Sequence, residues 1–425
     1  NSVAEPVPGT PVPPTDATTP PTTTPMVSAV LLRLGVAFTF SKFRNVWLAA
    51  FTSATGTWVQ RLAQQWLILS LTGSAFMLAL NTFFAELPLL LFTLFGGVIA
   101  DRHDRRHLLM GSQAVQMACA LTLTAIVFFD VTRVRYILAL SFISGLAQAF
   151  GGPAFQSLLP SLVPRQHLPN AIALNSIQFN LAQTIGPAIG GMVLVTAGMA
   201  ACFGLNGLSF LVVIAVLGLM RVPRTAPATR ERVLTELQGG LRYVRQNRAL
   251  LALTMLAFAT TSLALPVRAF LPVFAENEAH LSLMMTMSGA GAVVGALIVA
   301  WLGKFEHMGR TLLQVQVAFG GLVVAFALLP INSFSYVLLF LIGAALLMIF
   351  SLANSLVQLT VPDELRGRVI SIYLVAFRGG MPLGSLVSGY FTTHFTTSAV
   401  IAANGLLLSL VATGFLMGNR HVREL

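Results

Sequence analysis

The chain has 425 residues, of which 56% are hydrophobic and 9% charged, and its formal net charge is +11. Soluble domains carry about 25% charged residues, so this composition and a mean hydropathy of +0.81 exclude a soluble domain and indicate an integral membrane protein. The basic excess does not indicate a nucleic-acid partner, because 20 of the 25 Lys and Arg fall in predicted loops and tails on one side of the membrane.

The first 43 residues differ from the rest. Residues 1–25 are rich in Pro and Thr and lack large apolar side chains, so we expect them to be disordered. The start lacks the basic and apolar regions of a signal peptide, and residues 26–43 are read as a lead-in to the first helix.

Twelve apolar stretches follow, each long enough to cross a bilayer as a helix. A polar, Arg-rich connector at 222–248 divides them into two six-helix bundles, 44–221 and 249–418, followed by a tail at 419–425. The basic loops and both termini are placed in the cytoplasm by the positive-inside rule. The predicted spans are 44–70, 74–97, 107–129, 134–157, 167–195, 199–221, 249–275, 281–303, 310–330, 333–358, 366–391 and 397–418.

The two bundles look like a repeat. Val163-Pro164 recurs 198 residues later as Val361-Pro362, and Gly186 recurs at the same distance as Gly384. Two similar six-span halves are typical of transporters, whose substrate site lies between the halves near the membrane midplane.

The loop between spans 2 and 3 resembles the signature of the major facilitator superfamily, G-x-L-A-D-R-x-G-R-R. Asp104 replaces the second Gly of the signature, and Ile99 replaces its Leu. The ending of the loop is similar to that of the bacterial exporter branch containing the enterobactin exporter and macrolide efflux proteins. The matching residues are Gly97, Ala100, Asp101, Arg102, Arg105 and Arg106.

This resemblance implies an all-α fold of twelve transmembrane helices in two pseudo-symmetric halves that rock about a central site. It gives the loop a gating role, carried by Gly97, Asp101, Arg102, Arg105 and Arg106. Gly97 is expected to let two helices approach closely. Helix 5 resembles the end of the antiporter motif of drug/proton exporters, which favours export and proton antiport, and there the matching residues are Gly186, Pro187, Gly190 and Gly191.

Four charged side chains lie inside predicted spans, namely Arg61, Glu86, Arg268 and Arg378. Each costs on the order of 3 kcal/mol in the bilayer unless it faces a cavity or a partner. Glu86 is either a proton carrier, a salt-bridge partner of Arg61 or Arg378, or a direct substrate contact. The three Arg either bind an anionic group of the substrate, or pair with Glu86 and snorkel.

Several uncharged polar residues complete the candidate substrate and coupling site. Gln60 and Gln64 continue a polar stripe on helix 1, and Gln178 and Asn354 add amides on two other helices. No phosphate-binding loop, catalytic triad or metal-ligand cluster is present, so neither an enzyme nor a cofactor is expected.

The sequence therefore predicts a monomeric, multi-pass protein of the bacterial inner membrane that exports a small amphipathic or anionic molecule, of drug or siderophore type. Protons are the expected coupling ion. A lysophospholipid or lipid flippase on the same fold is the alternative, and a channel or a non-transporting receptor is a third reading from a different class.

Overall fold

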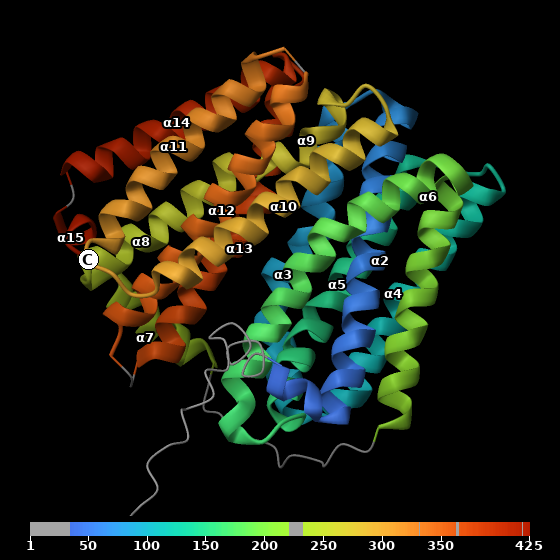
Figure 1. Ribbon diagram of the computed structural model, residues 1–425, viewed down its shortest axis with the longest axis horizontal. Coiled ribbons are helices and arrows are strands. Elements are labelled where there is room, and N and C mark those ends of the chain that lie inside the picture. Colours follow the sequence, from blue (N-terminus) through green and yellow to red (C-terminus); the bar gives the residue numbers. More distant parts are fainter. Residues whose placement is uncertain (1–34, 221–232, 331, 363–364, 419) are drawn as a thin grey trace, which may run out of the picture.

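The computed structural model describes residues 35–220, 233–330, 332–362, 365–418 and 420–425. The predicted tail over 1–25 lies outside this part of the chain, as do residue 221 and residues 222–232 of the connector. Every regular element of the described residues is a helix (Figure 1). The helices of the membrane spans are α2 (Ser41–Thr72), α3 (Ala75–Arg102), α4 (Arg105–Phe128), α5 (Val134–Leu158), α6 (Leu168–Leu219), α8 (Arg248–Ala259), α9 (Pro266–Phe274), α10 (Glu278–Leu302), α11 (Met308–Leu328), α12 (Ser333–Thr360), α13 (Arg366–Phe391) and α14 (Thr397–Gly418). The other helical elements are η1 (Val36–Thr39), η2 (Leu159–Ser161), η3 (Arg165–His167), α7 (Val233–Gln246), the π-helix η4 (Thr260–Ala264) and α15 (Arg420–Arg423).

Ten helical stretches of the described residues are long and apolar enough to cross a membrane. One of them contains two spans, because Gly198 has a φ of 82° and breaks α6 into two antiparallel segments. This left-handed backbone conformation favours glycine. A further span is α2, whose 32 residues are long enough but carry a polar stripe. The structure thus agrees with the twelve predicted spans.

Helices α8, η4 and α9 together make one irregular span. The backbone runs as an α-helix to Ala259, as a π-helix over η4, and as an α-helix again from Pro266. Pro266 lacks the N–H that would continue the ladder, and π segments are frequent at functional sites in helices. This span therefore differs from the regular helices around it.

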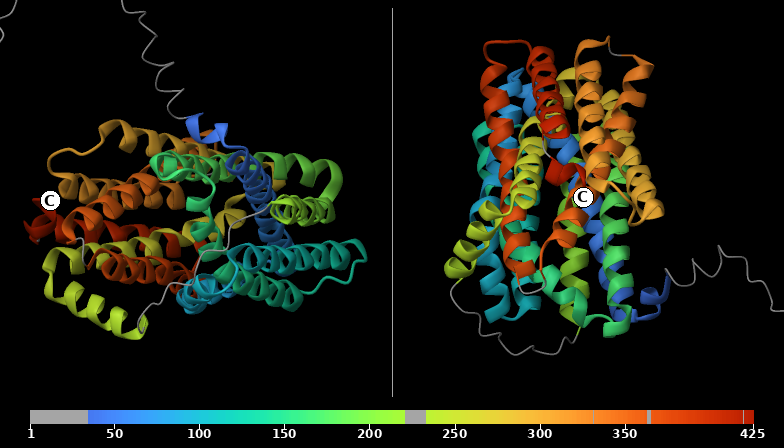
Figure 2. Two further views of the ribbon diagram at one scale, coloured as in Figure 1. Left: turned by 90° about the horizontal axis from the view of Figure 1, so that it is seen from below. Right: turned by 90° about the vertical axis from the view of Figure 1, so that its left-hand side faces the viewer.

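The helices form two groups, which Figure 1 draws in blue to green (α2–α6) and yellow to red (α8–α14). We call them the N-terminal and C-terminal halves. One end of the helices carries α7 and the α3–α4 connection and is called the basic side; the other end, with the α9–α10 connection, is the opposite side. In Figures 1 and 2 the helices run between these two sides.

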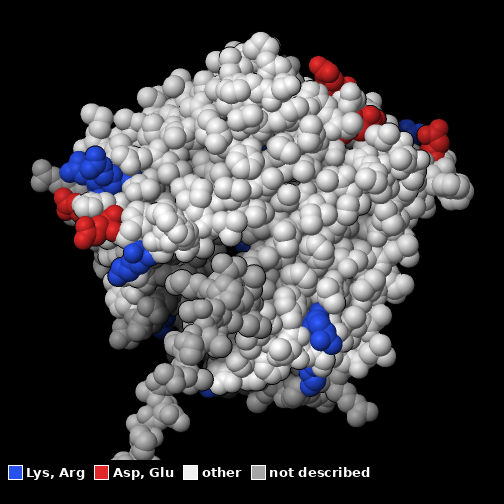
Figure 3. All heavy atoms as spheres, in the orientation of Figure 1, with Lys and Arg blue, Asp and Glu red and all other residues white. Residues whose placement is uncertain are grey.

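The halves meet mainly along two helix pairs, α3 with α13 and α6 with α10. Toward the opposite side these pairs are in direct contact. Ser282 Oγ on α10 donates a 2.8 Å hydrogen bond to the carbonyl of Pro187 on α6. A Cβ built on Gly389 of α13 would lie 2.3 Å from the Ala79 side chain of α3. The ribbons diverge toward the basic side, and Figure 3 shows the surface hollowed between the halves below their line of contact.

Candidate functional site

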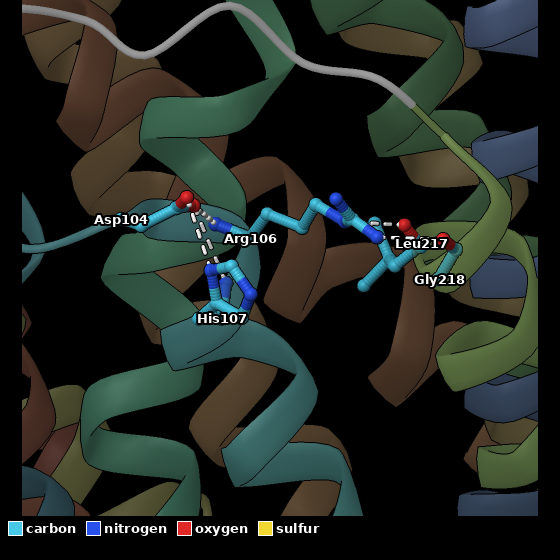
Figure 4. A network of polar contacts seen from close by, with 5 residues as sticks. All are labelled: Asp104, Arg106, His107, Leu217 and Gly218. Carbon is cyan, nitrogen blue, oxygen red and sulfur yellow. Dashed lines mark hydrogen bonds and ion pairs between the residues drawn. The ribbon is translucent and has the colours of Figure 1, made fainter.

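The basic side of the N-terminal half is held together by the loop with the signature motif (Figure 4). Asp104 caps α4, because its carboxylate accepts from the backbone N–H groups of Arg106 and His107. Burial alone would raise the pKa of Asp104, but the hydrogen bonds from the side chain and backbone of His107 outweigh it and lower the pKa. The acid that replaces the usual Gly of the signature is thus the N-cap of α4.

The two following arginines bind the ends of neighbouring helices. Arg106 donates to the carbonyls of Leu217 at 2.5 Å and Gly218 at 2.6 Å, at the end of α6. Arg105 donates to the carbonyl of Ser157 at 2.9 Å, near the end of α5. Cations at helix C-termini satisfy the last carbonyls and the negative end of the dipole. These two side chains fasten three helices of the N-terminal half to one another.

The rest of the signature is described in part. The side chains of Asp101 and Arg102 lie outside the described part of the structure. We expected Gly97 to permit a close helix approach, and this is wrong: a Cβ at Gly97 would meet nothing within 4 Å. The neighbouring Gly96 makes the approach instead, since its Cβ would lie 2.3 Å from the carbonyl oxygen of Ala149 on α5.

The glycines of the motif predicted on the fifth span lie on α6 and pack against two other helices, α2 and α10. A Cβ built on Gly186 would lie 2.4 Å from the Cβ of Trp58 on α2. Gly190 faces Val59, which is also on α2. Gly191 instead faces Ser282 of α10, the residue that binds the carbonyl of Pro187. One stretch of α6 therefore packs against both halves.

Two of the predicted intramembrane charges are neighbours. Arg61 Nη2 on α2 lies 4.0 Å from Glu86 Oε1 on α3, and the two side chains are 44% and 25% exposed. The Arg61 guanidinium also lies over the Trp58 ring, 4.7 Å from its centroid. At 4.0 Å the ion pair is loose, so both groups are available to other ligands.

A third charged side chain, Arg268, extends from the C-terminal half and contacts α6. Arg268 of α9 donates to the side-chain oxygen of Gln183 on α6, at 3.2 Å from Nη1 and 2.9 Å from Nη2, with the Gln183 carbonyl turned toward the guanidinium. Arg61 is close enough to act electrostatically on Arg268. We call Trp58, Arg61, Glu86, Gln183 and Arg268 the central cluster. Gln183 was not among the predicted site residues, because nothing in its spacing distinguishes it from the other amides of α6.

The remaining predicted residues lie elsewhere. Arg378 is exposed on α13, Gln178 is buried on α6 and Asn354 is half-buried on α12. No hydrogen bond or ion pair within the described residues joins these three to the central cluster.

Gln60 and Gln64 belong to a hydrogen-bond network inside the N-terminal half. Gln64 donates to Asn81 at 3.0 Å and to Ser141 at 2.7 Å. Gln60 donates to Gln64 and accepts from Asn206 at 2.7 Å. The network links helices α2, α3, α5 and α6. It therefore fixes the position of α2 next to Arg61.

The opposite side is closed across the halves. Trp66 Nε1 near the end of α2 donates a 2.8 Å hydrogen bond to Glu278 Oε1 at the start of α10. We call this bond, the Ser282–Pro187 bond and the Gly389–Ala79 contact the seal. The central cluster thus lies between the seal and the hollow that opens toward the basic side.

Comparison with known proteins identifies the architecture. A family model described as transmembrane secretion effector matches residues 36–424. The chain belongs to this family. Its members are transporters of the major facilitator superfamily, so the chain is a multi-pass membrane transporter and not an enzyme.

Named relatives of this family member are bacterial exporters. Macrolide efflux protein A of Streptococcus pyogenes is 23% identical over 87% of the chain and 94% of its own length. The multidrug efflux pump Tap of Mycolicibacterium fortuitum is 28% identical, with coverages of 85% and 91%. The enterobactin exporter EntS of Escherichia coli K12 is 26% identical, with coverages of 93% and 96%.

Solved structures of other transporters have the same fold. A bacterial homologue of the human lysosomal transporter Spinster, in an inward-facing and unoccupied conformation, superposes with a TM-score of 0.71 at 13% identity, covering 90% of the chain and 98% of its own. The nucleoside transporter NupG superposes with a TM-score of 0.69 at 14% identity, covering 88% of the chain and 98% of its own. At these identities the likeness concerns the fold alone.

Proposed function

We propose that this transporter exports a small amphipathic or anionic molecule from the cytoplasm by alternating access, in exchange for protons. The observation that carries the proposal is the central cluster, which combines one carboxylate and two guanidiniums from both halves beneath a closed seal. Charged groups at membrane depth are costly and are retained for function. Relatives named for macrolide, multidrug and enterobactin efflux support export as the direction.

The proposed orientation follows from charge. With the basic side in the cytoplasm, the loops that carry Arg105, Arg106 and Arg165 obey the positive-inside rule, and both termini are cytoplasmic. The hollow then opens to the cytoplasm, from which an exported substrate must enter. We propose a monomer in the bacterial inner membrane, because each chain contains both halves of a complete site.

In this proposal Glu86 carries the proton. It is the carboxylate of the central cluster, it is 25% exposed, and its contact with Arg61 is long enough to be broken and remade during the cycle. In the competing structural role, Glu86 stays ionised beside Arg61 and only balances its charge.

The test uses everted membrane vesicles that hold a respiration-driven pH gradient. Anionic, cationic, zwitterionic and neutral amphipaths are added in turn to vesicles with the wild type or Glu86→Gln. Collapse of the gradient by one class in the wild type alone supports proton-coupled export through Glu86. An equal response of both proteins assigns Glu86 the structural role, and no response from any class contradicts proton antiport.

A second candidate function is a lipid or lysophospholipid flippase. A cavity of about 460 Å³ lies between α6 and α10 near the seal, lined by Met192, Val195, Leu283 and Thr286 among others. A gap between helices is the feature expected for entry of an acyl chain. Transfer of a fluorescent lysophospholipid across reconstituted vesicles, lost on Ala188→Trp beside this cavity, would favour the flippase over the exporter.

A further inference from the structure

The two arginines of the central cluster have different partners. Arg61 has a carboxylate, Glu86, at 4.0 Å. Arg268 has no carboxylate within ion-pair distance among the described residues, and its guanidinium is held by the neutral amide of Gln183. This half-buried guanidinium is hydrogen-bonded to a neutral amide and lacks a counter-ion among the described residues.

One face of α6 brings these groups together. Gln183 and Gly186 are three residues apart, so their side chains lie on the same face of the helix. Gln183 binds Arg268, and Gly186 is covered by Trp58, which carries Arg61 on its ring. Arg268 and Arg61 therefore lie near the same face of α6, close enough for Arg61 to act electrostatically on Arg268, although they come from opposite halves.

The Gln183 contact orients Arg268. The amide oxygen accepts from both Nη atoms, at 2.9 and 3.2 Å, and Gln183 is itself buried, 8% exposed. The close packing of Gly289 against the backbone of Gln183 and Thr184 holds this part of α6 in place. The rigid amide thus fixes the guanidinium plane and leaves three N–H donors for a ligand.

We propose that Arg268, positioned by Gln183 and assisted by Arg61, is the anion-binding residue of the transporter, and that its ligand class is a small aromatic monoanion. A guanidinium recognises a carboxylate through directed N–H donors. Arg61 lies over the Trp58 ring, and Phe179 packs edge-on to the same ring with the two centroids 6.5 Å apart. Aromatic side chains therefore lie beside the charges of the cluster, which favours a flat ring in the ligand. The inference rests on the proposed function in treating the central cluster as the substrate site.

Binding of two isosteres to the full chain in lipid nanodiscs tests the proposal. The probes are 2-naphthoate and its uncharged analogue 2-naphthamide, measured by equilibrium dialysis against empty nanodiscs. A hydrogen bond to a charged group is worth enough for a preference of about 10- to 100-fold. We expect the wild type to bind naphthoate more tightly than naphthamide by such a factor.

Two variants locate the anion site. Arg268→Gln is expected to lower the naphthoate affinity about 10-fold or more and leave the naphthamide affinity unchanged, which also verifies folding. Gln183→Glu preserves shape but places a carboxylate on Arg268, so it should cause the same selective loss. A merely structural role of Gln183 would leave the preference intact. Arg310→Gln, exposed on α11, is the control and should bind both probes like the wild type.

The proposal is overturned if the wild type does not distinguish the probes, if both variants keep the preference, or if Arg378→Gln abolishes it instead. These outcomes are separate from a failure of the proposed function. Binding in nanodiscs requires no transport, so naphthoate selectivity with no substrate-dependent change of the pH gradient in vesicles would contradict proton-coupled export and leave the anion site standing.

Discussion

In the N-terminal half a network of side-chain hydrogen bonds connects the packed helices. It runs from Ser141 through Gln64 and Gln60 to Asn206. At the corresponding place in the C-terminal half, glycines of α13 lie against the π-helix η4. A Cβ built on Gly384 would be 1.9 Å from the Ser262 carbonyl oxygen, and one on Gly380 would collide with Thr261.

This difference shows that a repeated fold need not repeat its interior. Hydrogen bonds between membrane helices fix their relative positions. In the N-terminal half they join α2, which carries Arg61, to α3, which carries Glu86. The C-terminal half brings Arg268 on the irregular span after η4, where the helical ladder is already interrupted. The predictions that follow start from this contrast between the amide network of the N-terminal half and the glycine contacts of α13 with η4.

The largest effect is expected in the C-terminal half. Gly384→Ala should destabilise the protein by about 3 kcal/mol, because overpacking against a backbone carbonyl cannot be relieved by a side-chain rotation. The thermal midpoint in detergent is the measurement. Gly414→Ala, on α14 with open space around it, is the control and should be neutral or slightly stabilising. Equal midpoints for the two variants would contradict the close contact.

The second prediction compares one glutamine from each half. Gln64→Leu should cost about 1 kcal/mol or more, since bonds to Asn81, Ser141 and Gln60 are lost together. Gln316→Leu, on α11, should cost less: Gln316 makes one bond, to Thr260 at 2.7 Å, and its Oε1 has no partner among the described residues. A larger loss of the thermal midpoint for Gln316→Leu would reverse the comparison.

The third prediction concerns the basic side. Arg106→Gln removes the donors to Leu217 and Gly218, and we expect a loss of about 1 kcal/mol, as for a cation at a helix C-terminus. The control is Arg245→Gln on the exposed face of α7, expected within about 0.5 kcal/mol of the wild type. Indistinguishable thermal midpoints of the two variants would mean that Arg106 does not fasten α6.

The fourth prediction concerns the contact between the halves. For Trp66→Phe we expect a change in the balance between the closed and open forms of the seal, with little change in the thermal midpoint. Loss of about 1 kcal/mol from the seal shifts the balance toward opening on the opposite side by about fivefold. Labelling of a cysteine introduced at Ala79 should then become faster. Trp47→Phe removes a similar bond, to Leu174 at 2.9 Å, within the N-terminal half and should leave labelling unchanged.

The helices could be predicted closely from the sequence because membrane spans are long, continuous and apolar, and even the break at Gly198 falls between two predicted spans. The charged residues were found by the same rule, since an intramembrane charge stands out in any apolar run. Their partners could not be predicted. Depth along a helix follows from residue number, but the direction in which Arg61 or Arg268 points depends on helix rotation and on packing between halves.

Glycine and glutamine were harder to interpret for the same reason. Gly96 and Gly97 are adjacent, and only the helix rotation decides that Gly96 faces Ala149. Gln64 and Gln183 are both amides at membrane depth, yet one completes a network inside the N-terminal half and the other reaches across to Arg268. No periodicity within a single helix contains this distinction.

The first segment of α6 carries Gln183 at the central cluster and, two turns further along, Gly191 against Ser282 in the seal. Gly186 and Pro187 lie between the two contacts, and Pro187 lacks the N–H that would bond the Gln183 carbonyl, so the contacts lie on either side of a weak point in one helix. Bending at this point changes the spacing between the two contacts while the turns on either side stay helical. The geometry of both contacts with the C-terminal half therefore depends on four residues of α6, from Gly186 to Ile189.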